Sequence, residues 1–181
     1  MATYVILLRG INVGGKNKVP MAELRACLDE LGFTNVRTYI ASGNVLASSK
    51  LGATAARERI EAELSERFRL DTDLLRVLVL TPEKLRAIVE DRPEGFGDDP
   101  DTFHSDVIFL MDITPEQAMT VFQPREGVDE VWPGAGVVYS QRLSAERTKS
   151  RLGRIVGTKP YKSMTIRNWR TTTRLLDMLE E

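Results

Sequence analysis

One order of predicted secondary-structure elements occurs twice along the chain: strand, helix, strand, strand, helix, strand. Apolar runs and alternating patterns predict the strands, and an apolar residue every three or four positions predicts the helices. In the first copy the strands are expected at 1–8, 36–40, 44–47 and 74–80, with helices at 20–31 and 53–68 and a third helix that starts at Pro82. In the second copy the strands are expected at 106–111, 128–132, 137–140 and 162–164, with helices at 114–122, 144–156 and 166–179.

This order is that of the ferredoxin-like fold. We therefore predict an α+β protein that consists of two ferredoxin-like βαββαβ units with antiparallel sheets, plus a C-terminal helix. Residues 1–90 form the first unit, and residues 91–103, which are rich in proline, glycine and aspartate, form an acidic linker. Residues 104–181 form the second unit with the C-terminal helix.

The composition narrows the class of protein. With 42% hydrophobic and 28% charged residues among 181, the chain has the composition of a soluble globular protein. No apolar run approaches the roughly 20 residues that cross a bilayer, and the N-terminus lacks a signal-peptide pattern. The single cysteine, Cys27, excludes an intrachain disulfide and a cysteine-cluster zinc site. We expect a cytoplasmic protein with no membrane association, no metal site and no cofactor.

The connection between the first predicted strand and helix, residues 7–18 (LLRGINVGGKNK), is rich in glycine, asparagine and basic residues. Glycine lets the backbone turn its amides toward a bound anion, and arginine and lysine supply the matching charge. We therefore predict an anion-binding or phosphate-binding loop, to which Lys18 adds charge. Its candidate ligand-binding residues are Arg9, Gly10, Asn12, Gly14, Gly15 and Lys16.

The same loop matches the start of the Walker A motif, G-x-x-x-x-G-K-[ST], through Gly10, Gly15 and Lys16. Asn17, however, stands where a hydroxyl group would hold Mg²⁺. The helix is also expected to start only at Pro20, so its N-terminal amides would lie too far along the chain to join the loop. A nucleoside triphosphatase is therefore the weaker interpretation. The alternatives are a glycine-rich turn with solvated lysines and an anion-binding loop of another kind.

The predicted topology brings a second turn to this loop. Strand order in a ferredoxin-like sheet is 4-1-3-2, so the first and third strands are neighbours, and residues 9–18 should meet residues 42–44 at one end of the sheet. Ser42, Gly43 and Asn44 join the candidate site for this reason. The alternative is that Asn12 and Asn44 are ordinary turn residues with satisfied local hydrogen bonds.

Charges are segregated along the chain although the net charge is −1. Residues 90–130 are mainly acidic and residues 142–174 mainly basic. This asymmetry is typical of a surface for polyanions, or of two surfaces that attract each other within or between molecules. Base stacking on central strands, as in single-stranded RNA readers, is not expected, because the first strand carries only Tyr4 and residues 44–47 carry no aromatic residue.

Catalytic patterns are lacking. The only histidine, His104, lies in the run Phe103-His104-Ser105-Asp106, but neighbours in a strand point to opposite faces and cannot form a Ser/His/Asp triad. We interpret His104 as structural or surface, and no catalytic residue is assigned.

Three motifs together resemble a widespread bacterial family that is known only as a domain of unknown function. They are LLRGINVGG at 7–15, YIxSGNV at 39–45 and RNWRT at 167–171, so the resemblance covers essentially the whole chain. The resemblance implies an α+β protein of two ferredoxin-like units and no established activity, cofactor or partner. Ala41 departs from the family, in which glutamine is common at this position.

The third motif adds two candidate residues. Arg167 and Asn168 are expected in the first turn of the last helix, where free amides and the helix dipole favour anions. If this turn packs near the glycine-rich loop, a composite anion site follows. The alternative is that Trp169 anchors the helix in the core and Arg170 neutralises acidic neighbours.

Three hypotheses on function follow. The first is a cytoplasmic binding protein for a phosphate-bearing ligand, such as a nucleotide or a nucleic acid. The second is an enzyme that acts on a small phosphorylated or carboxylated substrate. The third is a structural module that self-associates through its opposed charges, so the oligomeric state stays open.

Overall fold

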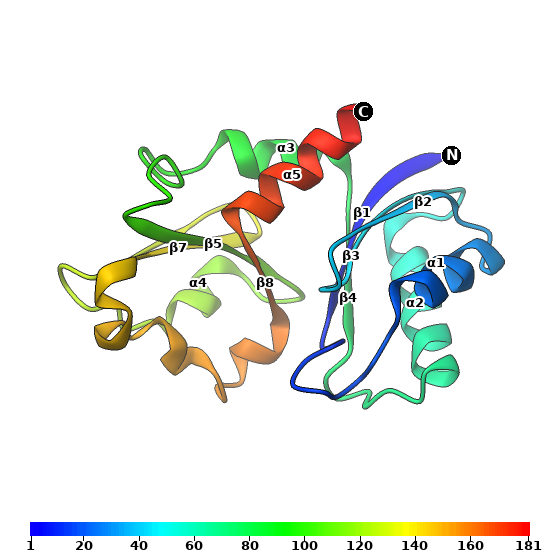
Figure 1. Ribbon diagram of the computed structural model, residues 1–181, viewed down its shortest axis with the longest axis horizontal. Helices are drawn as coiled ribbons and strands as arrows, with labels where there is room; N and C mark the ends of the chain where they lie inside the picture. The colour runs from blue at the N-terminus through cyan, green and yellow to red at the C-terminus, as the bar shows by residue number, and fades with distance from the viewer. The chain divides into compact units, whose positions relative to one another are not determined.

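The computed structural model describes all residues from Met1 to Glu181. The chain divides into two compact units, one of Met1–Leu85 with Leu175–Glu181 and the other of Arg86–Arg174 (Figure 1). The predicted boundaries at 1–90, 91–103 and 104–181 stay a prediction. No helix is both long and apolar enough to cross a membrane.

The first unit contains a four-stranded antiparallel sheet in the order β2-β3-β1-β4. Its elements are β1 (Ala2–Arg9), α1 (Met21–Glu30), β2 (Thr34–Tyr39), β3 (Asn44–Ser49), α2 (Ala53–Arg67) and β4 (Arg76–Leu80). Helices α1 and α2 cover one face of this sheet (Figure 1). Leu24, Leu28 and Ile60 from these helices pack there against Ile6 and other sheet residues. The sheet is therefore stabilised by one continuous apolar layer.

The neighbour relationship of β1 and β3 is confirmed. The two strands pair antiparallel from Ala2 opposite Ser49 to Leu7 opposite Asn44. The end of β1 and the start of β3 therefore lie at the same end of the sheet.

The second unit repeats the topology with the order β6-β7-β5-β8, also antiparallel. The remaining elements of the chain are α3 (Pro82–Glu90), β5 (Phe103–Leu110), α4 (Pro115–Met119), β6 (Asp129–Pro133), β7 (Val137–Leu143), β8 (Met164–Asn168) and α5 (Trp169–Glu180). Helix α4 opens with a capping box between Thr114 and Gln117. The predicted fold class, two ferredoxin-like units and a C-terminal helix, is confirmed.

The prediction of a helix at 144–156 is wrong. Two short 3-10 helices stand in its place, η1 (Ser144–Lys149) and η2 (Leu152–Ile155), and a third, η3 (Pro160–Ser163), follows. The carboxylate of Asp129 explains the interruption, because it accepts hydrogen bonds from Ser150 Oγ at 2.6 Å and from the Arg151 amide at 2.8 Å. A backbone amide bonded in this way is withdrawn from a continuous helix.

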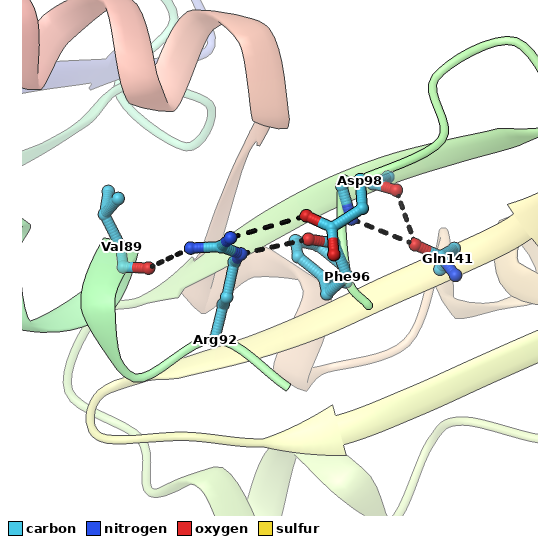
Figure 2. Close-up of polar contacts among 7 residues, drawn as sticks. Val89, Arg92, Phe96, Asp98 and Gln141 are labelled. Atoms are coloured by element: carbon cyan, nitrogen blue, oxygen red, sulfur yellow. Dashed lines mark hydrogen bonds and ion pairs between the residues drawn. The ribbon is translucent and has the colours of Figure 1, made fainter. Parts of the chain in front are cut away.

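The acidic segment before β5 is folded onto the second sheet. Phe96 is completely buried, with its ring edge-on to Trp132, Tyr139 and Trp169 at centroid distances of 6.0, 5.2 and 5.3 Å. Figure 2 shows how polar contacts hold this segment: Arg92 bonds to the Phe96 carbonyl at 3.2 Å and pairs with Asp98. The segment therefore contributes an aromatic side chain to the core of the second unit.

Candidate functional site

The glycine-rich loop is a small β-hairpin that projects beyond β1. The Val13 amide donates to the Lys16 carbonyl at 3.2 Å, and the Lys16 amide donates back to Val13 at 2.9 Å. Gly14 and Gly15 form the two-residue turn with φ of 56° and 77°, the geometry of a type I′ turn. The hydrogen bonds of the hairpin leave the amides of both glycines unused. Gly14, Gly15 and Lys16 are all exposed, so the two amides without a partner in the hairpin belong to surface residues next to Lys16 in the sequence.

This hairpin does not have the form of a Walker A loop. Helix α1 begins only at Met21, five residues after Lys16, so its N-terminus does not complete the loop. The Asn17 side chain donates to the Gly10 carbonyl at 2.9 Å and accepts from the Asp71 amide at 3.0 Å. Asn17 therefore closes the base of the hairpin, and the triphosphatase interpretation loses its structural basis.

The hairpin and the β2–β3 turn meet, as predicted. The Leu8 amide donates to the Gly43 carbonyl at 2.8 Å, and the Asn12 side chain donates to the Ala41 carbonyl at 2.9 Å. Gly43 is required here, because a Cβ atom at this position would lie 2.8 Å from the Leu8 Cβ. Residues 9–17 and 41–44 thus form one continuous surface at the end of the first sheet.

Two of the predicted binding side chains hold this surface in shape. Asn12 brackets Val19 by accepting from its amide at 2.8 Å and donating to its carbonyl at 3.0 Å. Asn44 is completely buried and donates to the Tyr39 carbonyl and to the Ser42 hydroxyl. The alternative role of turn residues with local hydrogen bonds describes both asparagines.

Arg9 also contacts the backbone of the first unit. Its guanidinium donates to the Leu74 carbonyl at 3.0 Å. Gly10 passes so close to the same carbonyl that a Cβ atom would lie 2.1 Å from its oxygen. Arg9 and Gly10 therefore fix the hairpin to the segment before β4.

Arg167 and Asn168 do not lie in the first turn of the last helix, which is a correction. They end strand β8 in the second unit, because Asn168 accepts from the Thr171 amide at 2.8 Å and so caps α5, which begins at Trp169. The Arg167 guanidinium is buried and donates to Thr165 Oγ1 at 2.8 Å. Burial lowers the pKa of Arg167 to about 10, which leaves it charged at neutral pH.

The alternation expected around His104 is present. His104 and Asp106 point to one face of β5, with His104 Nε2 and Asp106 Oδ2 at 3.0 Å. Ser105 points to the other face, where its hydroxyl donates to Gln141 at 2.8 Å. No triad forms, but His104 and Asp106 form a pair that the sequence interpretation did not include. Its spacing of two residues in one strand was the available signal.

Cys27 is a core residue of the first unit. Its side chain is fully buried between α1 and the sheet, and burial raises the pKa of its thiol. A thiol in this state is a poor nucleophile.

Comparison with known proteins places the chain in context. The family described as "Protein of unknown function (DUF1697)" matches residues 1–139. A solved structure, that of the conserved bacterial protein SP0830 from Streptococcus pneumoniae, is similar with 28% sequence identity and a TM-score of 0.84, and the similarity covers 98% of each chain. None of the curated proteins matches the chain.

Proposed function

We propose that this chain, which belongs to the DUF1697 family of proteins of unknown function, binds an anionic, phosphate-bearing ligand such as a nucleotide or a nucleic acid at the hairpin of the first unit. The observation that carries the proposal is the tip of the hairpin. There, two glycine amides that the hairpin does not use lie beside Lys16. Lys18 adds a second exposed positive charge within the same loop.

The chemistry of the tip suits an anion. Backbone amides that converge at a turn donate to phosphate oxygens, and lysine binds phosphate as a point charge. Arg9, Asn12 and Asn44 support the site indirectly, because their hydrogen bonds to backbone groups hold the loops in place. Ser42 is exposed on the adjoining turn and brings a hydroxyl group to the same surface. We place this function in the cytoplasm, as the sequence predicts.

The test is a binding measurement across salt concentrations. ATP, single-stranded DNA and single-stranded RNA are titrated into the full chain at about 20 to 200 mM salt. For a single-stranded oligonucleotide, log K falls with log salt, and each lost phosphate contact makes this negative slope shallower by about 0.7. The slope for the double variant Lys16→Ala/Lys18→Ala should therefore be shallower than that of the native chain by about 1.4.

Lys50→Ala is the matched control. Lys50 is exposed and follows the far end of β3, at the opposite end of the sheet from Asn44. This variant should bind as the native chain does. Absence of binding at the lowest salt, or equal loss in the control, would overturn the proposal.

A further inference from the structure

The second unit contains a cavity of about 330 Å³ that the proposed function does not use. Its floor is the face of the sheet formed by β5, β7 and β8, and its wall includes η1 and η2. This wall exists because the expected second helix is replaced by 3-10 turns that Asp129 ties to the sheet. A cavity of this volume lies at the lower end of the range for small-molecule sites.

One end of the cavity is polar and positively charged. The strand register places His104 opposite Arg142, and Asp106 opposite Ser140, all on one face. Arg147 joins them from η1. Arg142 is also the cross-strand partner of Asp129 on β6, so two guanidinium groups and an imidazole lie near the carboxylates of Asp106 and Asp129. His104 Nε2 lies 3.0 Å from Asp106 Oδ2.

The two guanidinium groups of this polar end are unengaged. Neither Arg142 nor Arg147 makes a side-chain hydrogen bond or an ion pair within the chain. Arg142 acts only through space on Asp106 and Asp129. The carboxylate of Asp129 is saturated by the amides of Arg125 and Arg151 and by the Ser150 hydroxyl. Two forked donors at a cavity are suited to a carboxylate or a phosphate group.

The other end of the cavity is apolar. Ile108, Phe122 and Ile155 line it, and they belong to the apolar cluster of the second unit. Val156, which is 62% exposed, forms part of the rim. A ligand that fills the whole cavity therefore needs an apolar body next to its acidic group.

We propose that this cavity binds a small organic anion, with its carboxylate or phosphate group at Arg142 and Arg147 and its apolar body against Ile108, Phe122 and Ile155. The site is independent of the hairpin in the first unit. It would give the chain a second ligand of a different size class from a nucleic acid.

The test uses four probes and amide NMR spectra of the full chain. Benzoate and phenyl phosphate carry both the acidic group and the apolar body, whereas benzamide lacks the charge and acetate lacks the body. Benzoate or phenyl phosphate should bind saturably, and the stronger of the two identifies the acidic group. Benzamide and acetate should bind at least about ten-fold more weakly, the factor that about 1.4 kcal/mol represents.

The location of binding separates this proposal from the hairpin site. The probes should shift the amide signals of Gly153 and Ile155, which line the cavity, and leave those of Gly14 and Gly15 in place. Arg147→Gln should weaken binding about ten-fold, because a charge-assisted hydrogen bond is lost. Lys149→Gln is the matched control, since Lys149 is an exposed cation in the same 3-10 helix but outside the cavity lining.

Three results would overturn the proposal: equal binding of benzamide and benzoate, equal effects of Arg147→Gln and Lys149→Gln, or shifts confined to Gly14 and Gly15. The last result would assign the anion to the hairpin instead. If Lys16→Ala/Lys18→Ala loses the binding of ATP or of a single-stranded oligonucleotide but still binds benzoate, the two sites are separate.

Discussion

The amide of Leu8, near the end of β1, donates a hydrogen bond of 2.8 Å to the carbonyl of Gly43, just before β3. This bond joins two residues that are more than thirty positions apart in the sequence, and it holds the β2–β3 turn against the end of β1. It also leaves no room for a side chain at position 43, where φ is +80°. The surface formed by the hairpin and the β2–β3 turn depends on this close approach.

Gly43→Ala should therefore destabilise the chain by about 1–3 kcal/mol, because a Cβ atom 2.8 Å from the Leu8 Cβ forces the turn away from β1 and adds backbone strain. Chemical denaturation of the full chain measures the change. Gly52→Ala is the control, because its φ is −69° and no atom lies within 4 Å of the added Cβ. Equal stability of the two variants would contradict the prediction.

Asp129→Asn should lower stability at neutral pH by about 1–3 kcal/mol and progressively less in acid. Burial raises the pKa of Asp129, but hydrogen bonds from Arg151, Ser150 and Arg125 and the charge of Arg142 outweigh it, so the pKa lies below the ordinary 3.8. A depressed folded pKa means that the contribution is complete above 3.8. It is lost as the pH falls through the folded pKa.

Urea denaturation of native and Asp129→Asn chains between pH 7 and pH 2 measures this difference. The gap in free energy of unfolding should be flat above pH 5 and should narrow below pH 4. Glu130→Gln, at the exposed neighbouring position, should show a small gap throughout. A gap that is independent of pH would show that the Asp129 carboxylate does not hold the 3-10 segment through its charge.

Phe96→Ala should destabilise the second unit by about 3–5 kcal/mol, because it removes a completely buried aromatic ring. The two tryptophans of the chain, Trp132 and Trp169, both contact this ring. Tryptophan emission should therefore change already in the folded variant. Phe33→Ala, in the core of the first unit, should destabilise the chain without changing the native emission spectrum.

Removal of residues 175–181 should destabilise the first unit. Leu175 and Met178 are buried, and Arg37 of β2 donates to the Met178 carbonyl at 2.5 Å. Hydrogen exchange should accelerate in β2 and β3 relative to the full chain, because these strands lose the contacts that hold them closed. Removal of Glu181 alone should have little effect, because its ion pair with Arg37 spans 3.8 Å at an exposed position. Unchanged exchange in the shorter chain would contradict the prediction.

Much of the fold could be predicted because hydrophobic patterns report on local structure. The strand order followed from the element order alone, and it brought the hairpin to the β2–β3 turn. The 3-10 segment could not be predicted, because its cause is the contact of Asp129 with Ser150 and Arg151, more than twenty residues away. The end of β8 could not be predicted for a related reason: Asn168 acts as a cap, which sets the start of α5 three residues later than the apolar pattern suggests.

The meeting of the two candidate loops could be predicted from the sequence, but the hydrogen bonds that their residues make could not. Glycine and asparagine residues indicate a turn whether they bind a ligand or only stabilise the turn through hydrogen bonds to nearby backbone groups. The sequence does not distinguish these two roles. Asn44 bonds locally to Tyr39 and Ser42, whereas Asn12 also donates to the Ala41 carbonyl, a contact that depends on tertiary structure. The cavity beside His104 could not be predicted from the sequence, because Arg142 and Arg147 come from different elements of the chain.

The return of the last seven residues to the first unit affects how the protein is made. Because Leu175 and Met178 complete that unit, we expect the N-terminal half of the nascent chain to finish folding only after Met178 has left the ribosome exit tunnel. The second unit, which is continuous from Arg86 to Arg174, emerges before it and can form its contacts first. We therefore expect the second unit to complete its fold before the first, although the first unit is synthesised earlier.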